Sequence, residues 1–137
     1  MAEGTYLVKL IKGTATYEIP MKYIAVESFA VTYSTLDLDS YRDANGLLHR
    51  NALAHKCAKV EFETPHMYAS ELDTLLANIK AKYISDIEKS VTVEVYVKEL
   101  DQYVTQKMYV PDIQTAIFQN SRYGYIYKPT RIAFIAY

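Results

Sequence analysis

The sequence predicts an α+β fold: mostly antiparallel β-sheets, in a sandwich or barrel-like arrangement, with one flanking amphipathic helix near residues 65–84. Three observations support this prediction. Apolar and polar residues alternate along several segments, as they do in strands with one buried face. One segment instead follows the period of an amphipathic helix. Four strand-like segments precede that helix and several follow it, an order typical of an antiparallel sheet that carries one helix.

Before the helix, the alternation is irregular in three segments and clear in a fourth. The irregular segments predict strands over Thr5–Ile11, Ala15–Ile19 and Lys22–Tyr33. In Ala58–Glu63 every second residue is apolar from the first position onward, so this strand should bury one face. The first half of the chain is therefore expected to supply four strands.

The helix prediction depends on a single apolar stripe. Its members are spaced at i, i+3, i+4, i+7 and i+11: Leu72, Leu75, Leu76, Ile79 and Tyr83. Thr64 offers a hydroxyl for the N-cap, and Pro65 suits the first helical turn. We therefore expect a helix over roughly residues 65–84 that packs this stripe against a sheet.

After the helix, the clearest strand is Val91–Val97, whose four valines share one face. Tyr103–Val110 is expected to pair with it in antiparallel fashion, because residues 98–102 are polar and few enough for a hairpin loop. Thr130–Tyr137 is expected to be a further strand. The second half thus adds at least three strands to the sheet.

Length and charge limit the kinds of protein this can be. The 137 residues suit one domain, expected to span residues 1–137. The 15 basic and 16 acidic side chains give a net charge of −1 and are spread evenly. Electrostatic binding to nucleic acid or to an anionic membrane needs clustered positive charge, so we expect neither partner. Charges interrupt the apolar residues of the N-terminus, which argues against a signal peptide and for a soluble chain.

The sequence offers little for a metal or cofactor. The histidines His49, His55 and His66 lack the spacing of a ligand set, and the single cysteine, Cys57, allows no intrachain disulfide. The acidic run Asp37–Gly46 fails as a calcium loop, because neither frame places glycine at position six and an acid at position twelve. No phosphate-binding glycine motif or nucleophile motif occurs. We expect no metal, no cofactor and no enzyme activity.

The most informative segment surrounds a tight-turn signal. The pair Asn45-Gly46 tolerates the positive φ that a hairpin turn needs. One interpretation is an ordinary hairpin tip between two strands. The other is a projecting loop that contacts another protein, because tyrosine and arginine are enriched at interfaces. The candidate interface residues are Tyr41, Arg42, Asp43, Asn45, Gly46, His49 and Arg50.

At this loop the sequence resembles a family of small proteins from phages and prophages of Gram-positive bacteria, found among tail genes. The similarity lies in Tyr41-Arg42-Asp43-x-x-Gly46-x-Leu48-x-Arg50, then in a strand at residues 59–62, a helix, and the segment Met108–Asp112. The resemblance implies a structural component of a tail or baseplate with no catalysis. It also implies contacts with other tail or baseplate proteins and with copies of itself, and a place in the virion tail after assembly in the bacterial host cytoplasm.

Two other kinds of function remain open from the sequence. A monomeric β-rich module could bind a ligand or peptide in a pocket lined by some of the tyrosines Tyr103, Tyr109, Tyr123, Tyr125 and Tyr127. A small enzyme has less support, because it would need a convergent polar site with a shifted pKa in a cleft.

Overall fold

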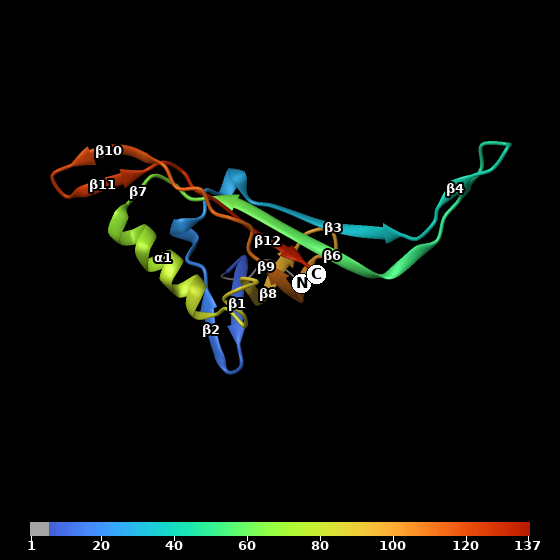
Figure 1. Cartoon of the computed structure of the whole chain (residues 1–137), viewed down its shortest axis with the longest axis horizontal. Helices are drawn as coiled ribbons and strands as arrows, with labels where there is room; N and C mark the ends of the chain where they lie inside the picture. The colour runs from blue at the N-terminus through green and yellow to red at the C-terminus, as the bar shows by residue number, and fades with distance from the viewer. Residues whose placement is uncertain (1–5) are drawn as a thin grey trace.

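The computed structural model describes residues 6–137, and most of them lie in antiparallel sheets with one flanking α-helix (Figure 1). A seven-stranded sheet has the order β2-β1-β8-β9-β12-β6-β3, and every neighbouring pair in it is antiparallel. Its strands, in chain order, are β1 (Val8–Lys12), β2 (Ala15–Glu18), β3 (Ala30–Asp37), β6 (Ala52–Glu63), β8 (Ser90–Val97), β9 (Gln102–Tyr109) and β12 (Arg131–Ala136).

The predicted fold class is confirmed, with one refinement to its arrangement. The sheets are not closed into a barrel, because β2 and β3 are the two edges of the seven-stranded sheet and are not paired with each other. β8 and β9 form the predicted antiparallel hairpin, with Val97 opposite Gln102 at the loop end. Of the strand expected over Thr5–Ile11, Thr5 lies outside the described residues, Tyr6 and Leu7 precede the strand, and β1 covers Val8–Ile11.

The core lies where the alternating faces of the strands meet the helix. Val91, Val93 and Val95 of β8 are fully buried, as their alternation predicts. The helix α1 (Ala69–Ala81) adds Leu72, Leu75 and Ile79 to the same core. Leu76, predicted for this stripe, is only half-buried and lies at the mouth of a cavity.

The helix is shorter than predicted, and the reason lies in its first turn. Thr64 does not cap it: Thr64 is buried, its backbone N–H donates to the carbonyl of Thr130 at 3.0 Å, and its hydroxyl accepts from the backbone N–H of Thr130 at 3.0 Å. These bonds continue the ladder between β6 and β12. The next residues form β7 (Met67–Tyr68), so the helix begins only at Ala69 and Tyr68 is its N-cap.

The strand predicted over Lys22–Tyr33 is also partly wrong. Two single-turn 3-10 helices, η1 (Met21–Tyr23) and η2 (Val26–Ser28), occupy its first half, and β3 begins only at Ala30. The hydroxyl of Ser28 donates to the carbonyl of Ala25 at 2.5 Å and accepts from the backbone N–H of Glu63 at 2.8 Å. This side chain gives the backbone a local alternative to the sheet, which is a common effect of serine.

Two small sheets lie outside the main one. A three-stranded sheet has the order β10-β11-β7, with β10 (Ile117–Ser121) and β11 (Gly124–Tyr127) joined as a hairpin. Sequence analysis did not predict this hairpin, because most of its residues are exposed and it lacks alternating burial. A two-stranded sheet, β4 (Tyr41–Arg42) with β5 (Leu48–His49), lies at the far end of β3 and β6.

Candidate functional site

The predicted interface loop lies at the tip of a projecting arm. β3 and β6 pair in antiparallel register, with Thr35 opposite Lys56, and then continue beyond the body of the protein. We call residues 36–54 the arm; β4 and β5 form its tip (Figure 1). The register is irregular between Thr35 and Asp37, just before β3 ends at Asp37 opposite Ala52 of β6. The arm is therefore an extension of two sheet strands rather than a separate loop.

Asp43 organises the turn at the tip. One carboxylate oxygen accepts from the backbone N–H groups of Asn45 at 2.9 Å and Leu47 at 3.0 Å, and the other lies 2.9 Å from Nε2 of His49. The hydrogen bond with His49, followed by the one from Leu47, holds the pKa of Asp43 below its ordinary value. Gly46 adopts a φ of 84°, in the left-handed region that glycine accepts readily.

The other polar residues of the tip also bond within the arm. Arg42 donates from its guanidinium to the carbonyl of Gly46 at 3.0 Å, and Nε of Arg50 donates to Asp37 at 2.9 Å. The rings of Tyr41 and His49 stack with their centres 4.8 Å apart. All seven predicted residues therefore lie on one hairpin, where most of the polar ones fix its shape; their contact with another chain stays a prediction.

The apolar residues of the arm are the ones that sequence analysis missed. Four leucines and Tyr41 are exposed along it, and Leu47 keeps 64% of its surface accessible. The leucines are Leu38, Leu47, Leu48 and Leu53. A hairpin tip in water is normally polar, so leucines on both sides of Asn45-Gly46 were a signal available in the sequence.

A second apolar surface lies at the opposite end of the molecule. The sheet β10-β11-β7 together with its β10–β11 turn, which we call the end sheet, is at the far left of Figure 1, while the arm reaches the far right. Its exposed aromatic and apolar residues are Tyr68, Ile117, Phe118, Tyr123 and Tyr125. Tyr123 is 71% exposed, and the guanidinium of Arg122 lies 5.0 Å from the centre of its ring. Arg122 is the charged residue between positions 117 and 127.

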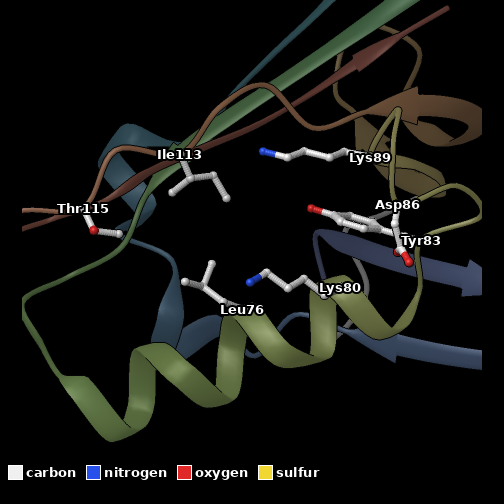
Figure 2. Close-up of a pocket in the computed structure, with 7 residues that line it drawn as sticks. All are labelled: Leu76, Lys80, Tyr83, Asp86, Lys89, Ile113 and Thr115. Carbon is white, nitrogen blue, oxygen red and sulfur yellow. The ribbon is translucent and has the colours of Figure 1, made fainter.

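A cavity of about 570 Å³ lies between α1, the turn that follows it, and residues 113–115. Figure 2 shows the ammonium groups of Lys80 and Lys89 and the hydroxyl of Tyr83 directed toward this space, with Ile113 reaching in from the other side. Burial raises the pKa of Tyr83, and the nearby carboxylate of Asp86 adds to that effect. None of the five tyrosines predicted to line a pocket is among the residues that line this cavity.

The histidines and the cysteine are scattered. His55 Nε2 lies 3.0 Å and Cys57 Sγ 3.4 Å from the backbone oxygen of Tyr137, while the ring of His66 packs edge-on against Phe118. Within residues 6–137, no three side chains of His, Cys, Asp or Glu are grouped so that they could hold a metal ion. No helix in that part of the chain is long and apolar enough to cross a membrane.

Comparison with known proteins places the chain in a family and gives a structural relative. The chain belongs to the family of unknown function DUF6711, whose profile matches residues 1–137. No curated protein matches it in sequence. Its fold is similar to that of a chain in the tail of an empty GTA particle with C6 symmetry: the TM-score is 0.50 at 15% identity, over 97% of this chain and 91% of the other. At that identity the likeness is one of fold.

Proposed function

We propose that this protein is a structural component of a phage or phage-like tail or baseplate, which acts by assembling with other proteins and catalyses no reaction. The observation that carries the proposal is the arm. It holds exposed leucines on a hairpin whose shape is fixed by its own polar contacts. Several leucines exposed on one projecting hairpin are unusual for a monomer, and exposed apolar surface of this kind marks contact sites. The similarity in fold to a chain from a C6-symmetric tail gives independent support.

In this proposal the partners are copies of this chain and other tail or baseplate proteins. The chain forms a homo-oligomer, and its place is the virion tail, assembled in the cytoplasm of a bacterial, Gram-positive host. The residues that make the contact are those of the arm tip. Asp43, His49 and Arg50 hold the hairpin in shape, and Tyr41 together with the leucines supplies the apolar area.

The proposal is tested by the assembly state of the full chain. We expect light scattering and electron microscopy to show oligomers of the wild-type protein, and the variant Leu47→Ser with Leu48→Ser to be a folded monomer. Circular dichroism melts check the fold, and these two exposed leucines should leave the melting curve nearly unchanged. A wild-type chain that stays monomeric up to its solubility limit, or an arm variant that assembles normally, would contradict the proposal.

The cavity favours a second candidate, a ligand-binding module. Its volume of about 570 Å³ is in the range of small-molecule sites, which combine apolar walls with a few converging polar groups. Lys80, Lys89 and Tyr83 would suit an amphipathic carboxylate. In this case a monomer should show saturable binding of octanoate by calorimetry, weakened by Lys80→Met with Lys89→Met. No heat with octanoate, or equal binding of octanol, would exclude this candidate.

A further inference from the structure

We propose that the arm of one copy docks on the end sheet of another copy, so that the chain assembles head to tail. This inference rests on the proposed function and names the receiving surface, which the proposed function leaves open. The observation behind it is the pair of exposed apolar surfaces, the arm and the end sheet. The chain exposes one such surface at each end of its long axis, and both are built on hairpins (Figure 1).

The contact must be between chains. The arm and the end sheet lie at opposite ends of the longest axis, so an arm cannot reach the end sheet of its own chain (Figure 1). The arm is also held in its extended direction by the β3–β6 ladder and by the ion pair between Arg50 and Asp37. A second copy supplies the missing surface without any change in the arm's direction.

The chemistry of the two surfaces is complementary. The arm presents flexible leucine side chains, and the end sheet presents the rings of Tyr68, Phe118, Tyr123 and Tyr125. Aromatic rings are large, rigid contact surfaces that lose little conformational entropy when they are covered. Leucine side chains packed against them would bury apolar area on both partners.

Charge favours the same pairing. Residues 36–54 hold three acids, Asp37, Asp39 and Asp43, against Arg42 and Arg50, so the arm has a net charge of −1 with its histidine neutral. Residues 117–127 hold Arg122 alone, a net charge of +1. An arm-to-arm contact would instead bring together two arms that each have a net charge of −1, and would leave both end sheets exposed to water. The head-to-tail contact covers both kinds of surface with one interface.

The symmetry follows from this geometry. When two different patches form the contact, a row of copies keeps one unoccupied arm at one end and one unoccupied end sheet at the other. Such heterologous contacts close into a ring when the rotation between copies allows it, and otherwise continue as a filament. The similar tail chain comes from a C6-symmetric assembly, which is an arrangement of this heterologous kind.

Two full-length variants and their mixture test the inference. The arm variant is Leu47→Ser with Leu48→Ser, and the sheet variant is Phe118→Ser with Tyr123→Ser. Each variant alone should be a monomer by light scattering. Mixed in equal amounts, they should form a dimer of one copy each and grow no further, because the intact arm of one variant meets the intact end sheet of the other. Ile87→Ser, at an apolar residue 97% exposed on a turn outside both surfaces, is the control and should assemble like the wild type.

The outcomes separate this inference from the proposed function. A mixture that stays monomeric, or a sheet variant that assembles normally while the arm variant does not, overturns the head-to-tail contact but leaves the arm as an assembly element. A wild-type chain that never assembles contradicts the proposed function itself. Near-identical thermal melts of both variants and the wild type establish that the loss of assembly is not a loss of folding.

Discussion

The two halves of β6 show how differently the body and the arm are built. From Ala58 to Phe62 every second side chain is fully or almost fully buried in the core, and this part of the strand pairs with β12 on one edge and β3 on the other. Residues 52–55 of the same strand are exposed, although Ala52 still pairs with Asp37 of β3. One strand therefore passes from a buried face to a face that nothing else within residues 6–137 covers.

Different interactions therefore stabilise the body and the arm. In the body, burial of alternating apolar side chains holds the strands together. At the arm tip, backbone and side-chain hydrogen bonds around Asp43 hold the turn, and the leucines contribute little because water surrounds them. Changes of equal size should consequently be costly in the body and almost silent in the arm, and the following predictions test that contrast.

The largest effect is expected for Leu75→Ala in α1. Leu75 is fully buried, so truncation should lower the free energy of unfolding by about 2–5 kcal/mol in urea melts. The neighbouring Leu76→Ala is the matched control: Leu76 is half-buried at the cavity mouth, and its loss should cost about 1 kcal/mol. Equal losses for the two variants would contradict the assignment of Leu75 to the core and Leu76 to its margin.

A smaller and more local effect is expected for Gly46→Val. A β-branched residue at a φ of 84° is strained even though no atom lies within 4 Å of the added Cβ, and the strain should cost about 1–3 kcal/mol. Because the tip makes few contacts with the body, the loss should appear as faster amide exchange at Leu47, with a small shift in global melting. Gly46→Asn, which tolerates positive φ better, should be milder; a Val variant with unchanged exchange would show that the tip is not ordered as described.

Acid should open the tip before it unfolds the body. The pKa of Asp43 is lowered in the folded protein, so its contribution is fully present above the ordinary carboxyl pKa, about 4. The contribution is lost as the pH falls through the lowered value, because the protonated acid accepts the hydrogen bonds of His49 and Leu47 less well. Protection of the Leu47 amide against exchange, measured relative to the intrinsic rate at each pH, should fall over this range in the wild type. Asp43→Asn should already show low protection at neutral pH and respond less to acid.

The same contrast explains what the sequence could predict. Alternation identified β8 and the buried half of β6, because each has a core on one side. The short polar loop after β8 predicted its pairing with β9. It missed the end sheet, where most residues of Ile117–Ser121 and Gly124–Tyr127 are exposed and nothing selects a face. The predicted start of the helix was wrong because Thr64 forms hydrogen bonds with Thr130. This partner is 66 residues away in the sequence and cannot be identified from a local pattern.

For the candidate site, the turn was predictable and its exposed surface was not. Asn45-Gly46 indicated the position of the hairpin tip, and Gly46 has the positive φ that the turn requires, whereas Asn45 does not. Whether Leu47 and Leu48 would be covered depends on how far β3 and β6 extend beyond the body, and that length is a property of the whole sheet. Arg42 and Arg50 looked like contact residues in the sequence, yet the structure shows them bonded inside the arm.

The smallest effect on stability, and the largest on assembly, is expected for Tyr41→Ala combined with Arg42→Ala. Tyr41 is exposed and stacks on His49, and Arg42 donates to the carbonyl of Gly46; both contacts lie within the tip, away from the core. Their loss should change the free energy of unfolding of the monomer by no more than about 0.5 kcal/mol, the usual range for surface substitutions. Assembly should be abolished, because the contact surface loses its tyrosine and the turn loses a bond that keeps the leucines in place. If the double variant forms oligomers like those of the wild type, the tip is only a hairpin end; if its melting falls by several kcal/mol, the arm is tied to the body more tightly than its exposed residues indicate.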